Sequence, residues 1–420
     1  MWAGLHHPLL RGLPFATAAM LILLSVSCQK RVARGPLKEV RLGYFANLTH
    51  AQAVLGVSSG EFAQAIAPAQ LRTQVFNAGP SLIEALLAGE IDIAYVGPGP
   101  ALNAQAKTNG LGIRVIAGAA SNGVIIVARP GSGIHTMADL KGRRLATPQH
   151  GNTQDLAARH YLSAVLHQEN EDNILPISNA EQSGMMSRGQ IDASWAPEPW
   201  GSFLVAQAGA QVIAEEKDLW PDKQFSLTVV ITTPDFLADH PDVVQKMLEV
   251  HRNWTRRLKQ DPQKYLPQLD AALFSLTGKR LPKGVLQSAI ARVQFTDEPS
   301  QQTFATLANW SYELEFTIQP PNLAGLFDTA ILHKLEKGAP AFLPLPPGEG
   351  RGEGEVAKDF HLGKRANSTK PSPRPSPGGR GGRRALVVED RQHGRDARAT
   401  GRTDRDRQKE IVRASSGSGH

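Results

Sequence analysis

Cysteine is almost absent from this sequence of 420 residues. The single Cys28 excludes an internal disulfide and any metal site built from several thiolates. The 13 histidines are scattered without an H-x-x-x-H pair, and no phosphate-binding loop, G-x-S-x-G or Ser-His-Asp spacing stands out. The sequence therefore predicts no bound metal, no cofactor and no enzyme of these classes.

Excess positive charge is missing from most of the chain. Residues 341–420 hold 17 Lys or Arg and 10 Asp or Glu, and so account for the whole formal net charge of +7. Residues 1–340 hold 29 of each kind. A folded part without net charge has no general attraction for nucleic acid, so we predict no nucleic-acid partner.

Long apolar runs are also scarce, and the clearest one lies near the N-terminus. Arg11 precedes the apolar stretch 13–26, which is short for a transmembrane helix and typical of a secretory signal. Cys28 follows at once, an arrangement that resembles a bacterial lipoprotein signal. We predict a signal peptide over residues 1–27, acylation of Cys28 as the membrane anchor, and a linker over 28–37. A simply cleaved signal and a retained N-terminal anchor remain open.

The end of the chain lacks apolar periodicity. Residues 339–420 are rich in Pro, Gly and Arg, so they cannot bury enough surface to offset their ordering entropy, and we predict disorder. Three interpretations compete: a phosphate-binding tail, a flexible spacer, and an intergenic repeat translated after loss of a stop codon. We favour the third, because two similar Pro/Gly/Arg blocks follow the fold without any link to it.

The body of the chain alternates short apolar segments with segments of helical periodicity, which predicts an α/β fold. The expected strands lie at residues 40–45, 71–76, 91–96, 115–117, 124–128, 144–147, 174–177, 191–195, 211–214 and 225–232. The expected helices lie at 50–67, 82–88, 101–107, 137–140, 154–166, 180–188, 201–208, 243–260, 262–273, 282–291 and 300–316.

Two such series, followed by a helical return, predict two lobes with mostly parallel sheets. We expect residues 38–128 and 226–338 to form lobe 1, and residues 129–225 to form lobe 2. The chain would then cross between the lobes near Arg129 and Phe225, and these crossings would act as a hinge. Ligands of open α/β sheets bind at the carboxyl ends of the strands.

Four motifs keep a fixed order along the chain. They are GEIDIAYVG at residues 89–97, MADLKGR at 137–143, RGQIDA at 188–193 and Glu198-Pro199-Trp200. Together they resemble the periplasmic binding proteins for nitrate, taurine and aliphatic sulfonates, over residues 39–317, and pyrimidine-precursor binders share the same layout. The resemblance implies a periplasmic-binding-protein type II fold. Asp92 and Asp192, inside two of the motifs, suit turn hydrogen bonds better than a site.

Loops rich in Gly, Pro and small polar residues follow four of the expected strands, and we predict ligand contacts there. The predicted contact residues are Asn47, Thr49, His50, Gly79, Pro80, Ser81, Gly97, Pro98, Gly99, Pro100, Gly151, Asn152, Thr153 and Gln154. The loops at 79–81 and 151–154 open helices, where free backbone N–H groups form a seat for an anion. Helix capping is the alternative role for these two loops and for residues 47–50.

Trp195, Glu198 and Trp200 complete the predicted site. Two tryptophans flanking a carboxylate after a strand suit a ligand with an apolar body and a cationic amine, such as taurine. In the family that the chain resembles, the matching acidic position lies at the cleft. The alternative is a surface Glu between two core tryptophans.

The resemblance implies a monomeric, exported solute-binding component of an ABC importer, in the periplasm or at the cell surface. It would close two lobes on a small anionic or zwitterionic ligand and dock on a permease with its ATPase. The sequence leaves sulfonate, taurine, nitrate, bicarbonate and aminopyrimidine open as ligands. One alternative is an enzyme on the same fold, of the menaquinone-pathway type, against which the export signal argues. A sensor domain is the other, although no signalling module follows.

Overall fold

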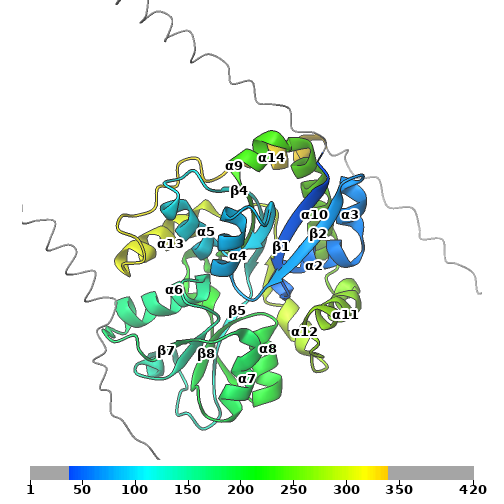
Figure 1. Cartoon of the computed structure of the whole chain (residues 1–420). Coiled ribbons are helices and arrows are strands. Elements are labelled where there is room, and N and C mark those ends of the chain that lie inside the picture. The colour runs from blue at the N-terminus through cyan, green and yellow to red at the C-terminus, as the bar shows by residue number, and fades with distance from the viewer. Residues whose placement is uncertain (1–36, 339–420) are drawn as a thin grey trace, which may run out of the picture. The chain divides into compact units, whose positions relative to one another are not determined.

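The computed structural model describes residues 37–338, which form two β-sheets flanked by helices (Figure 1). The predicted signal peptide, Cys28, nearly all of the linker and the tail lie outside the described residues. Within residues 37–338, no helix combines the length and the apolar character needed to span a membrane.

The first sheet has six strands in the order β11-β4-β10-β3-β1-β2. Its strands are β1 (Glu39–Phe45), β2 (Gln70–Phe76), β3 (Ile93–Val96), β4 (Arg114–Asn122), β10 (Ser226–Thr232) and β11 (Val293–Phe295). All seven residues of β10 are buried, with Val230 in one apolar cluster and Val229 and Ile231 in another. Alternate residues of a strand face opposite sides, so this sheet is covered on both faces.

The second sheet has five strands in the order β7-β6-β8-β5-β9. Its strands are β5 (Val124–Ala128), β6 (Leu145–Thr147), β7 (Ile174–Pro176), β8 (Ala193–Pro197) and β9 (Gln211–Glu215). Both sheets are mixed, with four parallel and five antiparallel pairings among the described strands, so the expected excess of parallel pairing is wrong. The reason is that β4, β5, β9 and β10, the strands next to the crossings, enter antiparallel pairs.

Helices fill the connections and the return. They are α2 (Ala51–Ser58), α3 (Glu61–Ile66), α4 (Gly79–Leu87), α5 (Pro98–Lys107), α6 (Thr153–His160), α7 (Asn179–Ser187), α8 (Trp200–Ala208), α9 (Pro234–Asp239), α10 (Pro241–Gln260), α11 (Leu266–Thr277), α12 (Val285–Ile290), α13 (Gln301–Glu313) and α14 (Ala330–Gly338). The helix expected at 50–67 is two helices, interrupted at Ser59–Gly60. The helix expected at 154–166 is α6 followed by a π-helical turn, Tyr161–Val165.

The chain passes from the first sheet to the second at Asn122–Gly123. β4 ends at Asn122, and β5, which we expected in lobe 1, begins at Val124 in the second sheet. The first crossing is therefore not near Arg129. Asn122 and Gly123 both have positive φ, 61° and 79°, a conformation that Asn and Gly tolerate best. This two-residue turn redirects the chain between sheets.

The second crossing, from β9 to β10, lies directly against the first. The Asn122 N–H donates to the Phe225 carbonyl at 3.0 Å, and the Phe225 N–H donates to Asn122 Oδ1 at 3.3 Å. One apolar cluster continues across the junction, with Val96 and Leu227 from the first sheet and Trp195 from the second. The lobes are therefore in direct contact in this structure.

Each sheet contains the same Arg–Asp contact between neighbouring parallel strands. In the first sheet, Asp92 accepts from Arg41 Nε at 2.9 Å and from the Arg41 backbone N–H at 2.8 Å. In the second, Asp192 accepts from Arg144 Nε at 2.9 Å and from its backbone N–H at 3.2 Å. Arg129 adds a further hydrogen bond to Asp192 at 3.0 Å. The aspartates of the two sequence motifs are thus structural.

Replacing Asp192 by Asn is expected to lower the free energy of unfolding at pH 7 by about 1–3 kcal/mol, because charge-assisted hydrogen bonds to two arginines are lost. Hydrogen bonding to Arg144 lowers the pKa of Asp192. A carboxyl group whose pKa is lowered on folding stabilises above its unfolded pKa. The difference between wild type and variant should therefore shrink as the pH falls below about 4.

Urea unfolding at pH 7 and pH 3.5 measures this difference. The exposed Asp172 in the same lobe gives a matched control, Asp172→Asn, which should change stability little. Equal effects of the two substitutions would contradict a structural role for the Arg–Asp contact.

Candidate functional site

The loop after β1 carries three of the predicted contact residues, and all three are buried. The Asn47 side chain does not cap the following 3-10 turn, Leu48–His50; its Oδ1 accepts from Trp200 Nε1 at 2.6 Å. His50 lies 4.4 Å from Phe45 between ring centroids, and its Nδ1 accepts the Phe45 N–H at 3.3 Å. Burial lowers the pKa of His50 to about 3, so its imidazole is neutral and supplies no positive charge.

The loops after β2 and β3 pack on each other. Gly79 and Pro80 begin α4, and Ser81 Oγ donates to the Ala78 carbonyl at 3.1 Å. A Cβ on Gly79 would overlap the Pro100 ring, so the absence of a side chain lets the two loops meet. The Ser81 hydroxyl is engaged locally, whereas the first N–H groups of α4 are not used by the helix itself.

The loop at 97–100 also receives the second lobe. Thr153, the first residue of α6, accepts a hydrogen bond from the Gly99 N–H on its Oγ1 at 3.2 Å. A Cβ on Gly97 would overlap the same Oγ1. The predicted loops of the two lobes are therefore in contact here: the backbone at 97–99 packs against the first residue of α6.

The start of α6 is capped as the sequence allowed. Asn152 Oδ1 accepts the Asp155 N–H at 2.7 Å, and Asn152 Nδ2 donates to Gln154 Oε1 at 3.2 Å. The Asp155 carboxylate accepts from the Gly151 N–H at 2.9 Å and from Arg159 Nε at 2.9 Å. Burial opposes its charge, but hydrogen bonds from His150 and Arg159 prevail and lower the Asp155 pKa. This helix start thus already holds one carboxylate.

Trp195, Glu198 and Trp200 do not form one group. Trp195 packs in the apolar cluster shared by the two sheets, whereas Trp200 packs in a separate small cluster with Phe203 and contacts Asn47 across the lobes. Glu198 is fully buried and lies at the first crossing, where its N–H donates to the Gly123 carbonyl at 2.8 Å.

The carboxylate of Glu198 is engaged by protein groups. It accepts from the Ser202 N–H at 3.0 Å, from Ser202 Oγ at 2.9 Å and from Arg292 Nη1 at 3.2 Å. Burial raises its pKa, and these donors oppose the rise. Arg292 also pairs with Glu215 through Nε at 3.3 Å. Replacing Glu198 would therefore lower the stability of the protein. The sequence predicts that this residue binds the ligand, and the structure gives it a structural role as well.

Glu216 is a buried acid that sequence reasoning missed. Its two oxygens accept from Trp195 Nε1 at 2.6 Å and from Trp220 Nε1 at 3.1 Å. Burial raises the pKa of Glu216 to about 7. It lies in the second crossing (residues 216–225), in a run of charged residues whose pattern is typical of an exposed turn, so no sequence signal marks it as buried.

A second set of contacts between the lobes was also missed. His160 of α6 stacks on Trp310 of α13, with ring centroids 4.1 Å apart, and its Nδ1 lies 3.3 Å from Glu313 Oε2. His150 stacks on Phe316 at 5.1 Å. Burial lowers the pKa of His160, against the opposing charge of Glu313. No sequence pattern links either histidine to its aromatic partner, because the partners lie about 150 residues farther along the chain.

The candidate residues therefore meet in contacts between the lobes, in pairs rather than as one pocket. Asn47 meets Trp200, and Gly97 and Gly99 meet Thr153, across the lobes, whereas Gly79 meets Pro100 within the first lobe. Three surface cavities of about 610–830 Å³ are lined by other residues. The one group of three metal-type ligands found among residues 37–338 contains none of the predicted site residues.

Comparison with known proteins gives a family. The sequence profile of the NMT1-like family matches residues 33–265. A protein of Brucella abortus, named only as a binding protein, is 29% identical over 181 residues, which are 42% of this chain and 54% of that protein. A protein of Escherichia coli named for binding aliphatic sulfonates is 28% identical over 203 residues, 48% of this chain and 62% of that protein. The matches thus span only part of each relative.

Solved structures give the fold. The alkanesulfonate-binding protein SsuA of Xanthomonas axonopodis pv. citri, bound to MOPS, matches with a TM-score of 0.59 and 22% identity, over 70% of this chain and 99% of that one. At this identity the likeness shows the fold alone. The two-lobe α/β fold expected from the sequence is confirmed, and so is the resemblance to binding proteins of this kind.

Adding a methyl group at Gly97 is expected to push the lobes apart. Gly97→Ala places a Cβ against Thr153 Oγ1, and overpacking of this kind costs about 1–3 kcal/mol. Thr153→Ala removes the obstructing oxygen, so the double variant should recover part of the loss in the free energy of unfolding. Chemical denaturation of all four proteins measures the coupling. Strict additivity of the two substitutions would contradict the contact.

Replacing Glu216 by Gln is expected to change how stability depends on pH. The folded pKa of about 7 lies above the usual value near 4.3, so the folded state holds an extra proton between these pH values. Stability of the wild type should therefore fall by about 2–4 kcal/mol as the pH rises from 5 to 8. Glu216→Gln should lack this fall, and the exposed Glu169→Gln should keep it. Parallel pH profiles of thermal unfolding for wild type and Glu216→Gln would refute the raised pKa of Glu216.

Proposed function

This chain belongs to the NMT1-like family, and from that premise we propose that it is the solute-binding component of an ABC importer. It captures a small anionic or zwitterionic nutrient between its lobes. The observation that carries the proposal is that loops at the carboxyl ends of strands in both sheets meet, at Gly99 with Thr153 and at Asn47 with Trp200. Ligands of open α/β sheets bind at these ends.

Closure about the two crossings supplies the mechanism. Within residues 37–338, the chain passes between the two sheets at 122–123 and again at 216–225. Opening there separates Thr153 from Gly99 and exposes the loops to solvent. A ligand that bridges both sets of loops binds the closed form better and shifts the population toward it.

The charges near the loops bear on the ligand. None of the predicted contact residues is Lys or Arg, and His50 is neutral. An anionic group would therefore be held by the N–H groups and the positive ends of α4 and α6. The Asp155 carboxylate at the start of α6, whose pKa is lowered, opposes a second negative charge there. This balance favours a singly charged or zwitterionic ligand of the sulfonate, taurine or nitrate class.

The remaining parts of the proposal rest on the sequence. Export by the N-terminal signal and acylation of Cys28 would anchor the protein at the outer face of the membrane. A monomer would then deliver its ligand to a permease and its ATPase without chemical change. Binding proteins among the relatives support this role.

A thermal-shift panel on the full chain tests the function. The compounds are taurine, an alkanesulfonate, nitrate, bicarbonate and an aminopyrimidine. A ligand at about 100 times its dissociation constant adds roughly 2.7 kcal/mol and raises the unfolding midpoint by several degrees. A shift with taurine, the alkanesulfonate or nitrate supports the proposal. A shift with the aminopyrimidine alone, or none on a cooperatively folding sample, contradicts it.

The variant Trp200→Phe tests where the ligand sits. It keeps an aromatic ring and removes the N–H that reaches Asn47 across the lobes, so ligand affinity should fall about 3- to 10-fold. Trp254→Phe is the matched control, because the buried Trp254 N–H has no partner within the described part of the chain. Calorimetric titration should show normal affinity for the control, and equal affinities for both variants would place the ligand elsewhere.

A further inference from the structure

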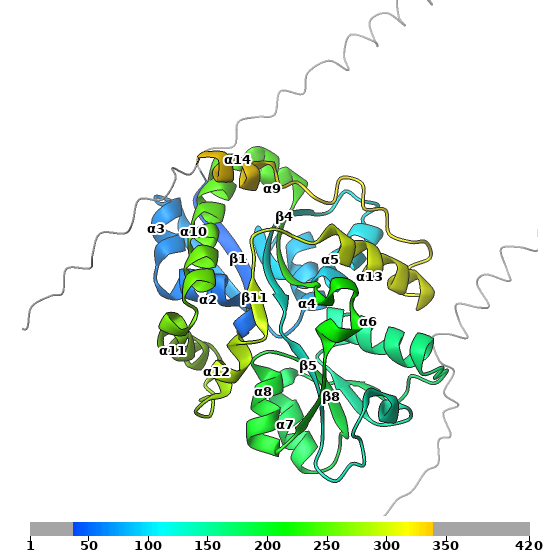
Figure 2. The same ribbon diagram turned by 180° about the vertical axis from the view of Figure 1, so that it is seen from behind.

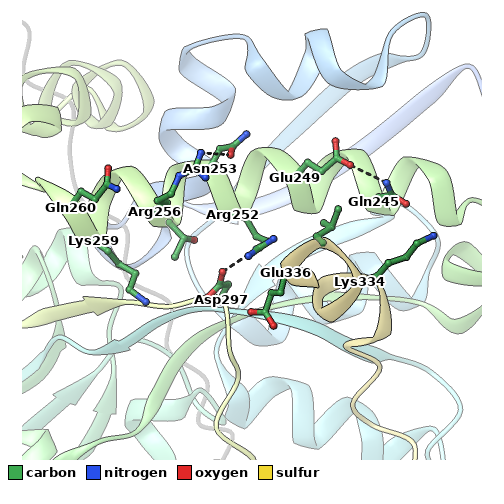
Figure 3. A pocket seen from close by; sticks show the side chains of 12 residues that line it. Gln245, Glu249, Arg252, Asn253, Arg256, Lys259, Gln260, Asp297, Lys334 and Glu336 are labelled. Carbon is green, nitrogen blue, oxygen red and sulfur yellow. Dashed lines mark hydrogen bonds and ion pairs between the residues drawn. The ribbon is translucent and has the colours of Figure 1, made fainter. Parts of the chain in front are cut away.

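A second polar region lies on the first lobe, away from the loops discussed above. Helix α14 packs beside the long helix α10, as Figure 2 shows, and a groove of about 830 Å³ runs between them and the segment after β11. Several polar groups in the groove have partners there (Figure 3): Arg252 pairs with Asp297 at 3.3 Å, and Gln245 donates to Glu249 at 3.0 Å. Glu336 also lines the groove, but it has no ion pair within residues 37–338.

Three potential metal ligands converge beside this groove. Glu298 follows β11, while His333 and Glu336 lie three residues apart on α14 and so face the same side of the helix. One ligand atom from each lies within 4.8 Å of the others. His333 Nε2 is 3.1 Å from Glu298 Oε1. Segments about 35 residues apart in sequence thus present one nitrogen and two carboxylate oxygens to a common point.

The imidazole of His333 is oriented from its other side. Thr329 Oγ1 lies 3.4 Å from His333 Nδ1, and Thr329 is not one of the three potential ligands. A contact at Nδ1 fixes the direction of the ring and leaves Nε2 directed at Glu298. A hydrogen bond of this kind on the second nitrogen is the usual companion of a metal-bound histidine.

The two carboxylates lack a permanent counter-charge. Among residues 37–338, His333 is the one ionic partner of Glu298, and no cation pairs with Glu336. Lys334 of the same helix points away from Glu336 (Figure 3). Two negative groups brought close by the fold repel each other, and a divalent cation between them removes that repulsion.

We propose that Glu298, His333 and Glu336 form a zinc site. One imidazole nitrogen and two carboxylate oxygens suit Zn²⁺, whereas Ca²⁺ and Mg²⁺ require more oxygen ligands. Ligands about 2 Å from a tetrahedral ion are about 3.3 Å apart, so these exposed side chains reach the geometry by small rotations. Water takes the fourth position. The ion joins α14 to the segment after β11 and so fixes the last described helix on lobe 1.

Zinc titration of the full chain, freed of metal by a chelator, tests the site. Two readouts are needed, because histidines elsewhere also bind zinc. Competition with a chromogenic chelator gives the affinity, and thermal unfolding shows whether the ion joins parts of the fold. We expect Zn²⁺, but not Mg²⁺ or Ca²⁺, to raise the unfolding midpoint by a few degrees.

The variants His333→Ala and Glu336→Gln are expected to weaken zinc binding at this site at least tenfold and to abolish the rise in midpoint. His135→Ala, at an exposed histidine of the other lobe, should keep both. Absence of a rise in the wild type, or an equal rise in all four proteins, would overturn the site and assign zinc to other side chains. Since all three ligands lie outside the interlobe contacts, neither result bears on the ligand panel.

Discussion

The hydrogen bonds between Asn122 and Phe225 hold both crossings of the chain at one place, and the relation of the two lobes depends on them. Any change in the angle between the sheets has to be absorbed there. Glu198 reinforces this place, since its N–H bonds to Gly123 and its carboxylate to Arg292. The residue that the sequence placed at the ligand is thus also a support of the hinge. Farther from it lie the contacts of Thr153 with Gly99 and of Trp200 with Asn47, which the proposed closure would make and break.

Much of the fold could be predicted from the sequence because it is local. Alternation and helical periodicity placed most strands and helices, and the GNT step at 151–153 marked a helix start that Asn152 does cap. The assignment of β5 to a sheet could not be predicted, because the two residues Asn122 and Gly123 decide it through their left-handed backbone. The hydrophobic periodicity of the two neighbouring strands does not predict where the chain turns between them.

The candidate site was less predictable for a geometric reason. Trp195 lies on a strand and Trp200 begins a helix, and the chain between them changes direction, so a spacing of five residues did not fix whether their rings share a face. The structure separates them. Glu216 and Arg292 acquire their roles from partners distant in sequence, Trp195 and Glu198, and a pattern read along the chain has no access to such pairs.

The distance between the two lobes, measured with and without ligand, tests capture by closure most directly. Spin labels at the exposed positions Glu90 and Lys141, with Cys28 replaced by Ser, report it by pulsed electron paramagnetic resonance. The account predicts a broad or longer distance distribution without ligand, and a narrow, shorter one when a compound that raises the unfolding midpoint is added. An unchanged distribution in the presence of a bound ligand would contradict it.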